Sequence, residues 1–239
     1  MRMGSAEGSD REARRRRIYL LGGSLLLAAI VVAALVLVSQ GNDAADSEAG
    51  DVSFLDGIPE RGIALGDPEA PVTIVEFADP QCPFCAEFSR EALPALVERY
   101  VKSGKVRMEL RLLDFIGPDS TRLAGAAHAA SLQGGLWRFA DLAYARQGPE
   151  NSGYADDAFI ESAAADAGLD AERVLAGVDS EGARSQLEEA KREAQAAGVE
   201  GTPAFLIGPT GGDLEPLEVD GLDASSFEGP IDAALEAAG

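Results

Sequence analysis

The longest apolar stretch of the chain lies near its N-terminus. Residues 18–38 read IYLLGGSLLLAAIVVAALVLV and carry no charged side chain. As an α-helix, these 21 residues would reach about 31 Å, which matches the hydrocarbon thickness of a bilayer. The pattern therefore predicts one transmembrane helix over 18–38.

The charges on either side of this run predict its orientation. Residues 1–17 contain six arginines, four of them consecutive at 14–17, whereas Asp43, Asp46 and Glu48 follow the run. Positive flanks stay inside, so 1–17 is interpreted as a cytoplasmic basic tail and the remainder as extracytoplasmic. A cleaved signal peptide is the alternative, but the apolar run is longer than usual and no clear small-residue cleavage site directly follows it. Either interpretation exports the body.

Residues 39–60 are polar, acidic and contain glycine, which is typical of a flexible linker. The pattern changes at residue 61, and 61–239 is predicted to be the folded domain. Within it, Val72–Phe77 is a β-branched run between two prolines and predicts a central strand. Helical spacing of apolar side chains follows over Cys82–Val101, with Pro94 as an expected kink.

The rest of the domain alternates between short strands and a long helical block. Val106–Leu112 alternates apolar and charged side chains, the pattern of a half-exposed strand, and completes a βαβ unit. Residues 120–197 are rich in alanine and are divided by glycines into four or five predicted helices. A predicted hairpin joins Ala204–Ile207 to 217–219, and Ala224–Ala238 ends the chain as a one-sided helix. The fold class is α/β with a helical insertion.

Charge restricts the possible partners of this domain. The formal net charge of the chain is -21. Residues 1–17 carry a net charge of +3, so the rest of the chain carries -24. Such a surface repels nucleic acid and anionic lipid, which argues against a nucleic-acid role.

Cys82 and Cys85 carry the most specific chemistry. They are the only cysteines of the chain and are three positions apart, so a structural disulfide would close a very small loop and add little stability. A zinc site would need two further ligands, yet His128 is the only histidine and is expected to be a packing or surface residue. Haem attachment needs a histidine where Ala86 stands. Thiol-disulfide exchange without a metal or cofactor is the remaining interpretation.

The two cysteines are expected to have different roles. Cys82 is at a predicted helix N-terminus, where backbone N–H groups and the helix dipole favour a thiolate, so it is the predicted nucleophile. Cys85 lies one turn further along, shielded, and is the predicted resolving thiol.

The order of these features resembles a known family. A strand, the motif Cys82-Pro83-Phe84-Cys85, a helix, a helical insertion and Thr202-Pro203 before a late strand resemble the DsbA-like branch of the thioredoxin superfamily, in its membrane-anchored bacterial form. The resemblance covers about residues 63–239 and implies a thioredoxin fold with a helical insertion, preceded by one transmembrane helix.

The resemblance also implies roles for individual residues. It implies a cis Thr202–Pro203 bond beside the dithiol, with an ordinary trans proline as the alternative, and a client peptide lying against Thr202, Pro203, Pro83 and Phe84. It implies that Glu76 is a buried acid that accepts the proton of Cys85, although periodicity alone would as readily leave Glu76 exposed. Because Phe84 replaces the histidine of the best-known oxidising members, the pKa of Cys82 is expected to be lowered less than in those members.

The expected function is oxidation of reduced, exported proteins, with a quinone-linked membrane protein implied as the reoxidase. Related isomerases carry an N-terminal dimerisation domain, and residues 39–60 are too few and too polar to form one, so a monomer is expected. The alternatives are a disulfide isomerase or reductase, and a non-redox, tethered peptide-binding module.

Overall fold

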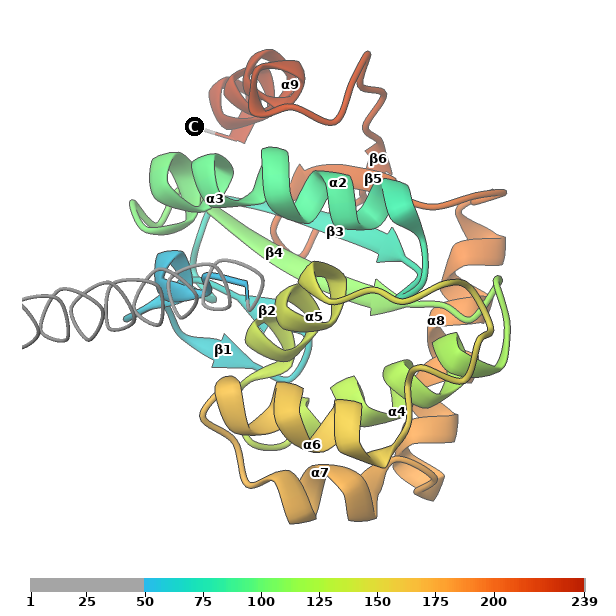
Figure 1. The fold of residues 1–239 in the computed structure, drawn as a ribbon. Helices are drawn as coiled ribbons and strands as arrows, with labels where there is room; N and C mark the ends of the chain where they lie inside the picture. The colour runs from blue at the N-terminus through green and yellow to red at the C-terminus, as the bar shows by residue number, and fades with distance from the viewer. Residues whose placement is uncertain (1–49, 239) are drawn as a thin grey trace, which may run out of the picture. The chain divides into compact units, whose positions relative to one another are not determined.

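A mixed six-stranded sheet lies at the centre of the computed structural model, which describes residues 50–238 (Figure 1). The strand order is β1-β2-β4-β3-β5-β6. The strands are β1 (Glu60–Arg61), β2 (Ala64–Leu65), β3 (Val72–Ala78), β4 (Val106–Leu112), β5 (Ala204–Pro209) and β6 (Glu215–Pro216). The predicted α/β class is confirmed, and the helical block is inserted between β4 and β5.

Strand β3 is central, as its sequence predicted. It pairs in parallel with β4, from Val72 opposite Val106 to Ala78 opposite Leu112, and antiparallel with β5. Every residue of β3 is buried, including the polar Thr73 and Glu76, so apolar and polar side chains do not alternate along this strand. Strand β4 does alternate between buried and half-buried side chains, as predicted.

The helices follow the predicted order with small shifts. They are α2 (Pro83–Glu91), α3 (Leu93–Leu96), the π-helical turn η2 (Val97–Val101), α4 (Pro118–Ser131), α5 (Leu136–Ala145), α6 (Asp157–Asp166), α7 (Ala171–Gly177), α8 (Glu181–Ala196) and α9 (Ala224–Ala238). The predicted kink is confirmed: the helix breaks at Ala92, because Pro94 has no N–H and its ring crowds the carbonyl of Arg90. The second strand of the hairpin, predicted at 217–219, is instead β6, two residues earlier.

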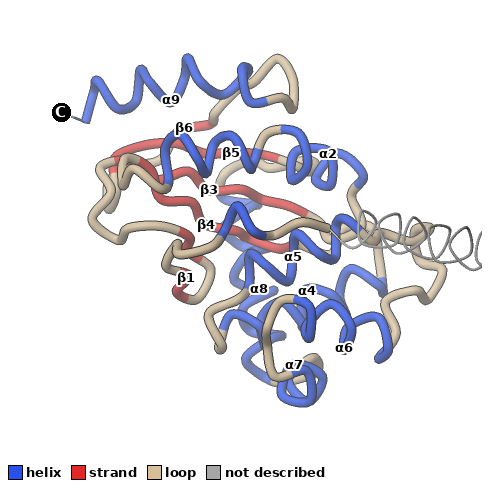
Figure 2. Tube along the Cα trace, turned by 60° about the vertical axis from the view of Figure 1, so that its left-hand side comes forward, coloured by secondary structure: helices blue, strands red, loops and turns tan. Residues whose placement is uncertain are grey.

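Helices α2 and α9 pack on the same face of the sheet (Figure 2). Three aromatic rings hold them there: the centroid of Phe88 in α2 lies 4.8 Å from that of Phe205 in β5 and 5.2 Å from that of Phe227 in α9, and the last two are 5.0 Å apart. Tilted and edge-on pairs at this spacing stabilise a core beyond the area they bury. The helix that carries the cysteines is therefore fixed to the strand that follows Pro203.

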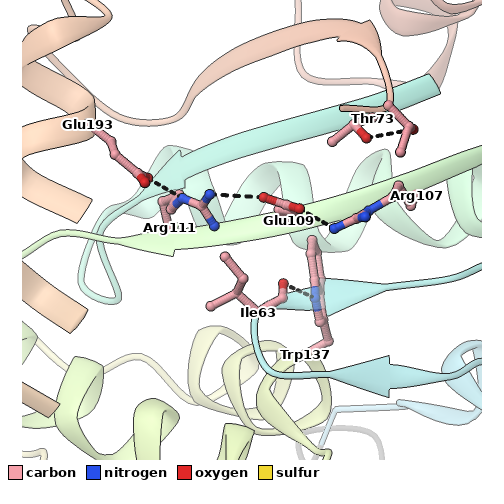
Figure 3. Close-up of polar contacts among 8 residues, drawn as sticks. Ile63, Thr73, Arg107, Glu109, Arg111, Trp137 and Glu193 are labelled. Carbon is pink, nitrogen blue, oxygen red and sulfur yellow. Dashed lines mark hydrogen bonds and ion pairs between the residues drawn. The ribbon is translucent and has the colours of Figure 1, made fainter. Parts of the chain in front are cut away.

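The opposite face of the sheet carries a chain of charges (Figure 3). Arg107, Glu109 and Arg111 project from this face of β4, and Glu193 of α8 meets Arg111. The Arg111 guanidinium lies 2.9 Å from the Glu109 carboxylate, and both side chains are mostly buried. Alternation of charge lets these groups neutralise one another where solvent is scarce.

The N-terminal boundary of the fold differs from the prediction. Residues 50–60 were assigned to the flexible linker 39–60, but η1 (Ser53–Leu55) and β1 belong to the folded unit, and Leu55 is fully buried. The backbone N–H of Trp137 donates to Glu60 Oε2 (2.9 Å), and Arg138 donates to the carbonyl of Leu55 (3.0 Å). The polar composition of residues 50–60 is typical of a linker. Composition does not show that Glu60 and the Leu55 carbonyl form hydrogen bonds with α5, and these bonds hold the segment in the fold.

The predicted tail 1–17, the transmembrane helix 18–38 and most of the linker lie outside the described residues. Between residues 50 and 238, none of the helices has the length and apolar character needed to cross a bilayer.

The packing of α4 on α7 gives a stability prediction. A Cβ at Gly125 in α4 would lie 2.2 Å from the carbonyl oxygen of Val178, so Gly125→Ala should destabilise the fold by about 1–2 kcal/mol even though alanine is the better helix former. Denaturant unfolding measures this. In the control Gly182→Ala, the new Cβ meets only the far end of the His128 ring, at 2.8 Å, and the change should stay within about 0.5 kcal/mol. Equal effects in both variants would contradict the close contact.

Candidate active site

The turn between β3 and α2 positions both cysteines. Cys82 is the N-cap of α2 with an extended backbone, and its N–H donates to the carbonyl of Asp79 (2.9 Å). Cys85 lies in the first turn of the same helix, and both are free thiols. A position at the exposed start of a helix predicts an accessible Cys82, but only 5% of it is accessible, against none of Cys85. The order of exposure agrees with the sequence, whereas the extent does not, because Thr202 lies against the Cys82 sulfur.

Hydrogen bonding lowers the pKa of Cys82 to about 6. The largest cause is the hydrogen bond from the Cys85 thiol. Burial acts in the opposite direction and raises the pKa. Hydrogen bonds from the Thr202 side chain and from the backbone N–H groups of Cys85 and Phe84 lower it further. In its thiol form Cys82 donates to the carbonyl of Thr202 (3.2 Å), which favours the protonated state, but the several donors facing the sulfur outweigh this single acceptor. The backbone N–H groups at the start of α2, which the sequence predicts as the cause, do lower the pKa of Cys82, but the Cys85 thiol lowers it more.

Burial has the opposite effect on Cys85. Loss of solvent, together with the hydrogen bond to Cys82 and the charge of Glu76, raises its pKa well above the ordinary thiol value. The two sulfurs are therefore electrostatically unequal, one stabilised as a thiolate and the other as a thiol.

Glu76 lies on β3 beneath the dithiol and is only 3% exposed. Desolvation, reinforced by the charges of Cys82 and Asp141, raises its pKa to about 8. Within residues 50–238, no hydrogen bond reaches its carboxyl group. A carboxyl that keeps its proton near neutral pH can deliver one to a leaving thiolate or accept one from a thiol.

The late proline loop borders the cysteines, as expected. The Thr202–Pro203 peptide bond is cis, and both residues are half-buried. On the other side Phe84 is 58% exposed and Pro83 is exposed too. These residues present an accessible apolar ring and backbone next to Cys82.

A buried polar network, absent from the sequence interpretation, holds the turn before Cys82. Asp79 accepts hydrogen bonds from the N–H groups of Gln81 (2.8 Å) and Ile116 (2.9 Å) and from Ser120 Oγ (2.6 Å). Gln81 in turn accepts from the N–H of Asn151 (2.7 Å). The signal for this network is the Asp-Pro-Gln run at a strand end, where polar side chains commonly satisfy loop backbone.

Other candidates lie elsewhere. His128 exchanges a hydrogen bond with Gln186 of α8 (2.5 Å), in line with the packing or surface role expected of it. Trp137, Phe139 and Tyr144 are buried in the core. In the described part of the chain, no three His, Cys, Asp or Glu side chains are grouped to hold a metal ion.

The comparisons with known proteins agree with this geometry. A family model described as Thioredoxin matches residues 59–222. The probable disulfide bond formation protein D of Bacillus cereus is 29% identical over 148 residues, which is 60% of this chain and 68% of the relative. The protein of the same description from Bacillus anthracis is 40% identical over 86 residues, 35% of this chain and 40% of the relative.

Solved structures show the same fold. Oxidised BdbD from Bacillus subtilis superposes with a TM-score of 0.64 at 20% identity, over 80% of this chain and 97% of that one. A thioredoxin-like oxidoreductase from Silicibacter pomeroyi superposes with a TM-score of 0.58 at 27% identity, over 78% and 98% of the two chains. The chain therefore belongs to the thioredoxin family, and the predicted resemblance to its DsbA-like thiol-disulfide oxidoreductases is confirmed.

Proposed function

We propose that this chain is an extracytoplasmic thiol-disulfide oxidoreductase that introduces disulfides into exported proteins through Cys82 and Cys85. The observation that carries the proposal is the asymmetry of the dithiol, in which the pKa of Cys82 is lowered to about 6 while that of Cys85 is raised. Stabilising one thiolate favours the reduced dithiol, and so favours passing the disulfide to a client.

The reaction proceeds by two exchanges. A client thiolate attacks Cys82 Sγ of the Cys82–Cys85 disulfide, the S–S bond breaks, and Cys85 leaves as a thiolate that takes a proton from Glu76. A second client thiolate then attacks the client sulfur of the mixed disulfide and expels Cys82 as its stable thiolate. Two electrons pass from the client to the dithiol, and the client gains one disulfide.

Client binding is assigned to the surface beside Cys82. Phe84 and Pro83 offer apolar contact, while Thr202 and Pro203 border the sulfur on the opposite side. An extended segment lying between them would bring its own sulfur to Cys82.

The remaining parts of the proposal concern location and turnover. Residues 18–38 would hold the domain at the membrane, with 1–17 in the cytoplasm. A quinone-linked membrane protein would take the two electrons from the reduced dithiol and restore the disulfide. The chain is proposed to act as a monomer.

A refolding assay tests the direction of the reaction. The oxidised full-length chain is mixed with a reduced, unfolded two-cysteine protein and, separately, with a scrambled protein containing several disulfides. We expect rapid oxidation of the first and little rescue of the second, and a Cys82→Ser/Cys85→Ser double variant should give neither. Efficient rescue of the scrambled protein with negligible oxidation would overturn the proposal in favour of an isomerase. Binding of peptide without either reaction would indicate a non-redox module.

A further inference from the structure

We infer that Asp141 is a positioning residue of the redox site, sharing one proton with Glu76 across a water-sized cavity so that this proton is at hand for Cys85. The inference rests on the proposed function and adds a residue of the helical insertion to it. Asp141 is on α5, far in sequence from both cysteines.

The cavity brings the two carboxyl groups together. It measures about 10 Å³, roughly the space that one water molecule needs, and Glu76, Ser89, Asp141 and Tyr144 are the polar side chains in its wall. All four are buried. Apolar side chains form the rest of the wall, so the cavity is a small space of mostly apolar surface on which these four polar groups border.

Two of the polar groups in the wall are without a partner. The Tyr144 hydroxyl is buried and has no hydrogen-bond partner among the described residues, and the Glu76 carboxyl has none either. Leaving buried polar groups unpaired is costly, so a single water that bridges them is the simplest way to satisfy both. Burial raises the pKa of Tyr144 well above its ordinary value, so its hydroxyl remains a donor.

Asp141 is held in place from α2. The Ser89 hydroxyl donates a hydrogen bond to Asp141 Oδ1, which fixes the carboxylate on the cavity side of α5. Ser89 is one helical turn after Cys85, so α2 carries both the resolving thiol and the group that orients Asp141.

The ionisation of the pair fits a shared proton. Desolvation raises the pKa of Asp141 to about 6, against the hydrogen bond from Ser89 and with help from the charge of Asp51. The pKa of Glu76 is raised to about 8 by desolvation and the charges of Cys82 and Asp141. Between these values the two carboxyls hold one proton, because two buried negative charges repel one another.

Transfer of this proton balances the exchange. When Cys85 leaves as a thiolate, the O–H bond of Glu76 breaks and an S–H bond forms, and both carboxyls are then ionised. When the Cys85 thiol instead attacks a mixed disulfide, its proton returns to the pair. The titratable groups around the pair are Cys82, Cys85, Tyr144, Asp51 and Asp79.

Titration of the reduced, full-length chain tests the inference without any client. Infrared spectroscopy follows the protonated carboxyl signal from pH 5 to 9, and the wild type should lose it in two steps. Asp141→Asn should remove the lower step and move the upper one down by about one pH unit, because Glu76 loses a neighbouring negative charge. The pH profile of client oxidation should move in the same direction.

Ser89→Ala provides a second, independent variant. It removes the hydrogen bond that favours the Asp141 carboxylate, so the lower step should move to higher pH. Asp157→Asn is the matched control, because this aspartate is 79% exposed and neither step should move. An unchanged upper step in folded Asp141→Asn, or unchanged steps in Ser89→Ala, would overturn the inference. Failure of client oxidation with both steps shifted would instead contradict only the proposed function.

Discussion

Cys85→Ser should accumulate mixed disulfides with client proteins, whereas Cys82→Ser should form none and lose exchange entirely. Cys82 is the more accessible sulfur and has the lower pKa, so in Cys85→Ser its thiolate attacks a disulfide of an oxidised client, one client sulfur leaves as a thiol and the other stays bonded to Cys82. Without Cys85 no internal thiol can resolve the adduct. Non-reducing electrophoresis of the two single variants distinguishes them, and adducts that form with Cys82→Ser but not with Cys85→Ser would reverse the assignment.

The pH dependence of the same site separates two effects of Cys85. Alkylation of Cys82 should rise with pH through a midpoint near 6, since only the thiolate reacts. Because the Cys85 thiol is the strongest donor to Cys82, Cys85→Ala should move the midpoint upward, while Cys85→Ser keeps a hydroxyl donor and should move it less. Midpoints unchanged from the wild type in both variants would mean that the Thr202 side chain and the backbone N–H groups stabilise the thiolate without the Cys85 thiol.

Glu76→Gln should slow client oxidation near neutral pH and, at the same time, make the protein more stable at pH 8. The first effect follows because glutamine cannot give a proton to the leaving Cys85 thiolate. The second follows from the sign of the pKa change. The folded protein binds the Glu76 proton up to about pH 8, whereas the unfolded chain releases it near 4.5, so this group costs stability as pH rises between these values.

Unfolding experiments at several pH values check the stability effect. The variant should match the wild type near pH 4.5 and exceed it by about 2–4 kcal/mol at pH 8. Glu109→Gln is a matched control on the opposite sheet face: it removes an ion-paired carboxylate and should destabilise the fold by about 1–3 kcal/mol. A Glu76→Gln variant no more stable than the wild type at pH 8 would mean that the carboxylate is compensated in the fold.

Much of the fold and the identity of the two reactive sulfurs could be predicted from local sequence. The β-branched run of β3, the kink at Pro94 and the five glycine-delimited helices between residues 118 and 196 follow from backbone preferences and periodicity, which are local properties. The spacing of Cys82 and Cys85 defined the reactive pair for the same reason.

The partners of Glu76 could not be predicted in this way. Burial of Glu76 depends on helices packed over β3, and periodicity fails in a strand that is buried on both faces. Asp141 could not be identified from the sequence, because single polar residues are usually exposed. Its neighbours gave a usable signal, since Trp137 to Tyr144 is apolar on nearly every side and such a helix is buried all round.

The aromatic packing of Phe88, Phe205 and Phe227 has a consequence for affinity. Phe88 is six residues after Cys82, and Phe205 is two residues after Pro203, so the same rings fix both walls of the client-binding surface. The conformational entropy of arranging these walls is lost once, when the chain folds, and is not lost again at each encounter with a client. Binding is then limited mainly by the ordering of the unfolded client, which suits an enzyme that must accept many sequences and release each one quickly.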